Sequence, residues 1–308
     1  MQTTSHILMI RPVQFGFNTQ TAVNNAFQQV NNETGVQEKA QQEFDRFVAL
    51  LRGHGVDVTV IDDTPEPHTP DSIFPNNWVS FHHDGSVILY PMFAENRRLE
   101  RKPHIIGKIA ENFRIDRTTD LSDFEAKDLY LEGTGSMVLD RTHKVAYACL
   151  SPRTHPEVLK AFAEATGYET VEFHAADAQG VAIYHTNVLM CIGDDYAVIC
   201  LDAIPSEEER KHVEEKLKGS RKTVITITLD QMNHFAGNML QVQSLRGRKL
   251  LVMSTQAFSS LTPGQITALS AFNPIVHAPL DVIEKNGGGS ARCMMAEIHL
   301  PGKAAISQ

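Results

Sequence analysis

The sequence contains few cysteines, few basic residues and no long apolar run, and each shortage excludes a class of protein. Its four cysteines, among 308 residues, are far apart and form no CxxC pair, so neither a disulfide framework nor a structural zinc site is expected. The apolar run at residues 7–10 ends at Arg11 and is too short for a signal sequence or a membrane span. We therefore expect a cytoplasmic protein without a membrane partner.

The charge balance and the histidine spacing exclude two further kinds of partner. The chain has 28 Lys and Arg against 37 Asp and Glu, a formal net charge of -9, which opposes nucleic-acid binding through counterion release. Its 14 histidines form no HxxxH or HExxH pattern, so we expect no metal and no cofactor. A homo-oligomer stays open.

The domain organisation follows from the lack of a linker. No stretch rich in Pro, Gly or Ser divides the chain, and 42% of its residues are apolar, enough for one large core. We expect a single domain over residues 1–308.

A repeating unit is visible in the positions of the turn signals. Four turns separate pairs of strand-like runs, at Asp84-Gly85, Asp140-Arg141, Gly193-Asp194 and Arg246-Gly247. These turns are 56, 53 and 53 residues apart, and helical patterns follow them at residues 95–113, 155–166, 206–217 and 263–272. Each unit therefore reads as a hairpin, a helix and another strand.

A fifth unit requires the two ends of the sequence to meet. It combines the last predicted strand, residues 291–300, with the first, residues 6–11, and takes its helix from the amphipathic segment of about residues 23–51, interrupted near Gly35. This pattern predicts an α/β fold, a five-bladed pseudo-symmetric propeller of ββαβ units in which the terminal strands close the ring. A mixed open sheet is the alternative.

The first candidate for chemistry is Cys293, which follows the run Gly287-Gly288-Gly289 at the head of an apolar strand. A thiol at a tight glycine turn can lie at the mouth of a site and accept hydrogen bonds that favour its thiolate. The alternative is a buried cysteine beside a flexible loop. A nucleophilic cysteine also needs an acid-base partner, and His185, between two apolar runs, can supply it.

Two acidic turns complete the candidate site. Glu132 lies in the segment Leu131-Glu132-Gly133-Thr134-Gly135, before a strand, where its alternative is a solvent-exposed carboxylate. Asp71, Phe74 and Asn77 lie in the turn before the first hairpin, where an Asx-rich turn is the alternative.

Four motifs recur in one order: Asp71 with Phe74 and Asn77, Glu132-Gly133, His185-Thr186-Asn187, and Gly287-Gly288-Gly289 followed by Cys293. Together they resemble the guanidino-group-modifying superfamily, which includes arginine deiminase, dimethylarginine hydrolase, succinylarginine dihydrolase and amidinotransferases. The resemblance covers nearly the whole chain. It implies a five-bladed α/β propeller, the pentein fold, with a Cys-His-Glu/Asp site at its centre.

The resemblance also implies roles for individual residues. These are Cys293 as nucleophile, His185 as general acid and then base, Glu132 as the carboxylate that holds a substrate nitrogen, Asp71 as a second binding carboxylate, Phe74 as the ring over the planar group, and Arg97 and Arg153 as ligands of the substrate carboxylate. For the two arginines, solvated surface positions are the alternative.

Three departures from the family pattern remove negative charge from the site. Asn77, Asn187 and Gly135 stand where guanidine-binding relatives tend to carry aspartate. A guanidinium presents only N–H donors, whereas a ureido group also presents a carbonyl oxygen, which an amide donor suits. We therefore expect Asn77 and Asn187 to bind the ureido group of citrulline.

The sequence is similar to the citrulline-hydrolase branch, whose reaction gives ornithine, ammonia and carbon dioxide through an S-carbamoyl enzyme. One alternative is an arginine deiminase or dimethylarginine hydrolase that works through an S-amidino enzyme. An amidinotransferase and a non-catalytic binding module on the same fold are further alternatives.

Overall fold

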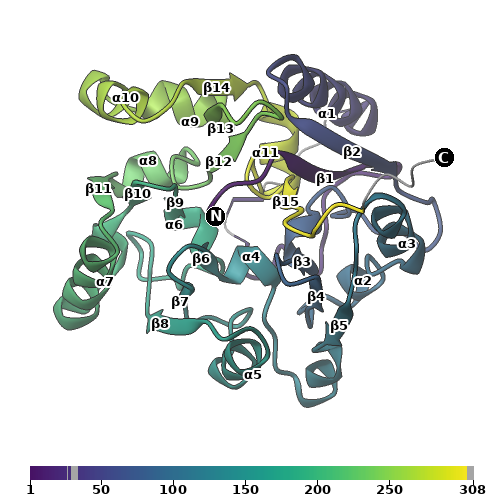
Figure 1. Ribbon diagram of the computed structural model, residues 1–308, viewed down its shortest axis with the longest axis horizontal. Helices are drawn as coiled ribbons and strands as arrows, with labels where there is room; N and C mark the ends of the chain where they lie inside the picture. The colour runs from purple at the N-terminus through teal and green to yellow at the C-terminus, as the bar shows by residue number, and fades with distance from the viewer. Residues whose placement is uncertain (26, 29–33, 304–308) are drawn as a thin grey trace.

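The computed structural model describes residues 1–25, 27–28 and 34–303 of the chain. In this part, the strands form five sheets of three strands each. Figure 1 shows the sheets arranged around the middle of the molecule in chain order, with helices on the outer side. The fold is therefore α/β and is built from five similar units.

Four of the units share one topology, and the first shows how the sequence produces it. Strands β3 (Val79–Phe81) and β4 (Ser86–Leu89) form an antiparallel hairpin, and β5 (Arg117–Asp120) pairs parallel to β4. Gly85 in the turn has a φ of 76°, a left-handed conformation that glycine adopts readily. Two short helices, α2 (Glu95–Arg98) and α3 (Pro103–Asn112), make the crossover that a parallel connection requires.

The other three units repeat this order of elements. The second contains β6 (Val138–Asp140), β7 (Val145–Cys149), α5 (Pro156–Thr166) and β8 (Glu169–Phe173). The third contains β9 (Met190–Ile192), β10 (Tyr196–Ile199), α7 (Glu207–Gly219) and β11 (Thr223–Thr226). The fourth contains β12 (Leu240–Gln243), β13 (Lys249–Ser254), α9 (Thr255–Ser260), α10 (Pro263–Ser270) and β14 (Ile275–Ala278). All four predicted hairpins are confirmed.

The fifth sheet joins segments from opposite ends of the sequence. Strand β1 (His6–Arg11) pairs antiparallel with β15 (Ala296–Glu297) and parallel with β2 (Asp57–Asp62), and α1 (Val36–Gly53) precedes β2. The predicted pairing of the first and last strands is thus present, with Ile7 opposite Glu297.

Three predicted boundaries were wrong. The helix expected from about residue 23 begins only at Val36, because Gly35 has a left-handed φ of 70° and residues 21–24, 27 and 34 form turns; residues 26 and 29–33 lie outside the described part. The last strand is two residues long, since residues 291–294 form a turn. The helix predicted at 95–113 is divided, with Pro103 starting its second half.

The core explains why the site lies at the inner ends of the sheets. The hairpin strands β3, β6 and β9 are buried along their whole length, whereas the outer strands β5 and β11 are mostly exposed. Helices on the outside cover the sheets (Figure 1). The segments that enter the hairpins therefore lie inside, and they carry the polar side chains described next. No helix in the described ranges is long and apolar enough to cross a membrane.

Short helical turns precede the hairpins and orient these side chains. They are η1 (Pro75–Asn77), α4 (Gly133–Ser136), α6 (Thr186–Leu189), α8 (Leu229–Asn233) and α11 (Asp281–Gly287). Two further 3-10 turns, η2 (Ser122–Lys127) and η3 (Leu201–Ala203), lie elsewhere in the chain. Figure 1 places α4, α6 and α11 near the middle of the molecule.

Candidate active site

The glycine run at the end of α11 packs against the ring of Phe74 and leads into the turn that carries Cys293. A methyl group on Gly287 or Gly289 would lie only 2.8 or 2.9 Å from that ring, so both positions need glycine for this close approach. A tight turn follows, in which the Cys293 amide donates to the Ser290 carbonyl at 3.0 Å. The Cys293 side chain is 7% exposed and contacts the amide groups of two asparagines.

The other three cysteines are buried among apolar side chains. Burial raises the pKa of Cys149 and Cys191 to about 12 and the pKa of Cys200 to about 11. These thiols are therefore poor nucleophiles near neutral pH.

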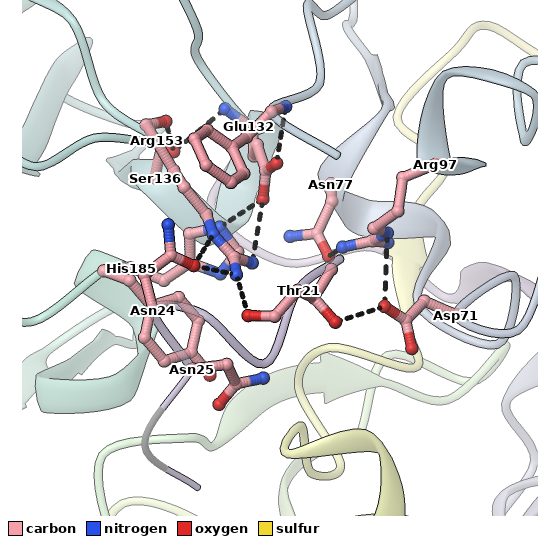
Figure 2. A network of polar contacts seen from close by, with 12 residues as sticks. Thr21, Asn24, Asn25, Asp71, Asn77, Arg97, Glu132, Ser136, Arg153 and His185 are labelled. Carbon is pink, nitrogen blue, oxygen red and sulfur yellow. Dashed lines mark hydrogen bonds and ion pairs between the residues drawn. The ribbon is translucent and has the colours of Figure 1, made fainter. Parts of the chain in front are cut away.

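His185 and Glu132 form a buried pair, drawn in Figure 2. Each residue directly precedes a short helix, α6 or α4, and the His185 Nε2 lies 2.7 Å from the Glu132 Oε2. The second carboxylate oxygen of Glu132 accepts the Phe93 amide at 3.0 Å. The alternative of a solvent-exposed carboxylate is therefore wrong for Glu132.

The environment sets the charge of each partner. Burial alone would raise the pKa of Glu132, but the Arg153 guanidinium and the His185 hydrogen bond bring it well below its usual range. Burial lowers the pKa of His185 to about 4, although the bond to Glu132 opposes this shift. Glu132 is thus ionised and His185 neutral near pH 7. In that state Nε2–H donates to Glu132, and Nδ1 is left as an acceptor.

Arg97 is buried at the opposite side of the site, with 3% of its surface exposed. Its guanidinium donates two hydrogen bonds, of 2.8 and 3.0 Å, to the Glu100 carboxylate and a third, of 3.0 Å, to the Asn77 Oδ1. Its Nε also lies 3.9 Å from Asp71. The alternative of a solvated surface arginine is therefore wrong for Arg97.

Arg153 is 1% exposed, so the same alternative is wrong there. Its Nη1 lies 3.5 Å from Glu132, and its Nε and Nη2 donate to the Asn24 side chain and the Thr21 carbonyl, each at 2.9 Å. Its guanidinium also lies 4.8 Å from the centre of the Tyr184 ring. Figure 2 shows that Arg153 and Asp71 both contact the segment that contains Thr21. The guanidinium groups of Arg97 and Arg153 both bind protein groups in this structure. Their role as ligands of a substrate carboxylate therefore stays a prediction.

Asp71 receives hydrogen bonds on one oxygen only. Its Oδ2 accepts from the Asn18 amide at 2.8 Å and the Thr21 hydroxyl at 3.1 Å, whereas Oδ1 has no partner in the part of the chain that is described. Burial raises the pKa of Asp71, although Arg97 opposes this shift. The carboxylate therefore keeps one free acceptor.

The predicted residues meet around one small cavity of about 20 Å³. Its lining includes Asp71, Phe74, Asn77, Arg97, Arg153, Tyr184, His185 and Cys293. Asn187 joins the group through its contact of 3.5 Å with the Cys293 sulfur. Within the described residues, no group of three or more His, Cys, Asp and Glu side chains is arranged as metal ligands.

Gly135 explains how Asn77 and His185 approach each other. A methyl group on this glycine would lie 2.9 Å from the His185 Nδ1 and would overlap the Asn77 Nδ2. Any side chain at position 135 would therefore fill the space that these two nitrogens face. Glycine at this position therefore leaves room for both nitrogens.

Sequence reasoning missed Asn238 and Tyr184. The Asn238 Nδ2 lies 3.2 Å from the Cys293 sulfur, and the Tyr184 hydroxyl donates to the Gly288 carbonyl at 2.9 Å. A signal for Asn238 was present, since Gly237-Asn238 comes directly before the fourth hairpin, as Asn77 comes before the first.

Comparison with known proteins adds a family and a set of similar folds. The sequence matches the family described as N,N dimethylarginine dimethylhydrolase, eukaryotic, over residues 11–300. No curated protein is similar enough in sequence to count as a match.

Solved structures give a similar picture. The N-terminal domain of ArgZ, an arginine dihydrolase from the ornithine-ammonia cycle in cyanobacteria, superposes with a TM-score of 0.76 at 19% identity, over 96% of this chain and 98% of that domain. Full-length ArgZ is longer, and this chain spans 41% of it. A dimethylarginine dimethylaminohydrolase superposes with a TM-score of 0.65 at 16% identity, over 97% of this chain and 100% of that one.

Proposed function

Because the chain belongs to the eukaryotic N,N dimethylarginine dimethylhydrolase family, and so is a hydrolase of carbon–nitrogen bonds, we propose that it hydrolyses the ureido group of citrulline. The products would be ornithine, ammonia and carbon dioxide. The proposal depends on which hydrogen-bonding atoms of the buried site are still without a partner.

The observation that carries the proposal is the free N–H group of Asn77. Its Oδ1 accepts from Arg97, which can only donate, so the orientation of the amide is fixed, and among the described residues the atom without a partner is Nδ2. A buried donor needs an acceptor. The carbonyl oxygen of a ureido group is such an acceptor, and a guanidinium offers none.

The remaining free atoms suit the other side of the same group. The Asp71 Oδ1 and the Asn187 Oδ1 are buried acceptors without a partner among the residues described. They can accept the N–H groups of a ureido substrate. One free donor and two free acceptors are therefore complementary to a neutral group that has one carbonyl and several N–H bonds.

The charges of the site also favour a neutral substrate. Glu132 already faces Arg153, and Glu100 and Asp71 already face Arg97. A guanidinium would therefore enter a site whose carboxylates are paired with buried arginines, so its desolvation would be poorly compensated.

The proposed reaction uses three side chains in sequence. The Cys293 thiolate attacks the ureido carbon, while the Asn77 N–H stabilises the developing oxyanion. Neutral His185 takes the proton that leaves the Cys293 thiol, gives it to the departing nitrogen, and then takes a proton from the water that hydrolyses the S-carbamoyl enzyme. The resulting carbamate loses carbon dioxide without further catalysis.

Glu132 was predicted to hold a substrate nitrogen, and the structure gives it contacts within the protein that suggest a further role. Its oxygens contact His185, Arg153 and the Phe93 amide, so in this proposal it orients the imidazole and stabilises its protonated form. Phe74 keeps its predicted role as the ring packed over the planar group.

The proposal extends to the organisation of the protein. We infer that residues 1–308 form a single domain in which the five sheets close as a propeller, supported by the pairing of β1 with β15. A cytoplasmic protein that acts on a free small amino acid, with neither nucleic acid nor membrane as partner, agrees with the composition.

A guanidino substrate is the second candidate. It is favoured by the similarity to ArgZ, an arginine dihydrolase, and by the free Asp71 Oδ1, which can also accept from a cation. That reaction would pass through an S-amidino enzyme and leave the Asn77 N–H facing a group without an acceptor.

The test is to incubate the protein separately with citrulline, arginine and dimethylarginine and to quantify ammonia, ornithine and citrulline. Cys293→Ala is the control that ties turnover to the thiol, and added acceptor amine tests for amidino transfer. Ornithine from citrulline, absent with C293A, supports the proposal. Citrulline formed from arginine or dimethylarginine, with no turnover of citrulline, would overturn it.

A further inference from the structure

The sulfur of Cys293 lies between two side-chain amides that come from different units of the fold. The Nδ2 of Asn238 is 3.2 Å from the sulfur, and the Nδ2 of Asn187 is 3.5 Å from it. Sulfur accepts hydrogen bonds weakly as a thiol and more strongly as a thiolate, so the two amides would be most favourable after the proton has left.

Only Asn238 is fixed in the orientation that donates to sulfur. Its Oδ1 accepts the Arg292 amide at 3.1 Å, and its Nδ2 donates to the Asn187 carbonyl at 3.0 Å. A flipped amide would place acceptor against acceptor and donor against donor at these two backbone groups. The Nδ2, and not the Oδ1 at 3.7 Å, is therefore the nearer atom to sulfur.

Asn187 differs because its Oδ1 has no hydrogen-bond partner in the described ranges. Apart from the contact with sulfur, no side-chain hydrogen bond in these ranges fixes its orientation. The two amides thus differ in role. Asn187 can donate to the substrate in place of the sulfur, while Asn238 keeps its hydrogen bond to the sulfur.

The Arg292 backbone explains how Asn238 also fixes the position of the nucleophile. Arg292 directly precedes Cys293, and its guanidinium binds the Met295 carbonyl at 2.8 Å and Glu297 at 3.0 Å. The turn that carries the sulfur is therefore tied to strand β15 at one end and to Asn238 at the other. Asn238 is 1% exposed, so water does not compete for these bonds.

We infer that Asn238 is a catalytic residue whose N–H donation stabilises the Cys293 thiolate and holds it in position, an inference that rests on the proposed function. A guanidinium would bring a positive charge to the sulfur and so help to form the thiolate. A neutral ureido group brings no charge, and the protein must then supply the stabilisation itself. A neutral amide does this without attracting a cation into the site.

The test measures the thiol directly and needs no substrate. Iodoacetamide is uncharged, so a new charge in a variant does not steer it, and C293A supplies the background rate from the other cysteines. We expect Asn238→Ala to slow alkylation of Cys293 about 10- to 100-fold near pH 7, the range expected for one hydrogen bond to a charged acceptor. Asn238→Asp, which places an acceptor at sulfur, should be slower still, and the rate–pH curve should move to higher pH in both variants.

A matched control separates this effect from general damage. Asn273 is similarly buried and its Oδ1 accepts from Tyr196 and Gln241, but no contact joins it to Cys293 in the described structure. Asn273→Asp should therefore leave the alkylation rate unchanged.

Each outcome then decides the matter. Slow alkylation in folded N238A or N238D, with N273D at the wild-type rate, supports the inference. If those variants alkylate slowly while no citrulline is turned over by the wild type, the inference stands and the proposed function fails. A folded N238A that alkylates at the wild-type rate would overturn the inference. So would the loss of cooperative unfolding in both variants, because Asn238 would then be structural alone.

Discussion

Acidification should destabilise the protein through His185, by an amount that follows from the pKa of its buried imidazole. Burial lowers this pKa to about 4, against an ordinary value of 6.5 in the unfolded chain. Between these values the unfolded chain binds a proton that the folded chain excludes, so stability is lost as the pH falls below 6.5. From pH 7.5 to pH 5 this one residue should lower the free energy of unfolding by about 2 kcal/mol.

A difference measurement isolates this contribution. His185→Gln keeps a side chain that can donate to Glu132 but cannot titrate, and urea unfolding of both proteins at pH 7.5 and pH 5 gives the change in each. Other groups with shifted pKa values, such as Glu284, whose pKa burial raises to about 7, are present in both proteins and cancel. The wild type should lose about 2 kcal/mol more than the variant on acidification.

Equal losses in the two proteins would refute the reasoning, because they would mean that folded His185 protonates at its ordinary pH. The imidazole would then be charged in part near neutral pH and its Nδ1 would not be free to accept a proton. An NMR titration of the His185 ring proton, assigned by its absence in H185Q, checks the same point directly and should give a midpoint near pH 4.

Three other substitutions test separate contacts. Asn77→Asp removes the free N–H while leaving Arg97 an acceptor, so kcat/KM for citrulline should fall about 100-fold or more while the thermal unfolding midpoint changes little; a fully active variant would disprove the oxyanion role. Arg153→Met leaves the buried Glu132 without its guanidinium, and the free energy of unfolding in urea should fall by about 3 kcal/mol; a loss below about 1 kcal/mol would show that the ion pair matters little. Gly133→Ala should cost more stability than Gly247→Ala in calorimetry, since both have positive φ but only the first would press a methyl group against backbone carbonyls of η1. Equal losses would mean that the backbone yields there.

Local sequence signals predicted the elements well where the turn chemistry is local. The hairpins at Gly85 and Gly247 follow from glycines with left-handed φ, and the pairing of β1 with β15 follows from counting units. The sequence predicted the interruption near Gly35, which has a left-handed φ. It misled only for the segment before Gly35, whose apolar spacing is helical although residues 21–24 form turns.

The site was predictable as a set of residues and less so as a set of contacts. Cys293, His185 and Glu132 were identified by residue type and position, but the partner of Glu132 was not, because the distance to His185 depends on how two units pack. Asn238 was missed for the same reason. Its function depends on a sulfur 55 residues away in the sequence, and only its position before the fourth hairpin could have indicated it.

The pairing of Ile7 with Glu297 means that the nucleophile is assembled late during synthesis. The turn that carries Cys293 is anchored to β15, and β15 leaves the ribosome after the strands of the other four sheets. Bringing two segments nearly 300 residues apart together costs about 5 kcal/mol of loop entropy in an unfolded chain, and far less once the intervening sheets have formed. A nascent or partly folded chain therefore lacks the amide contacts of the sulfur, and thiol reactivity becomes a reporter of complete folding.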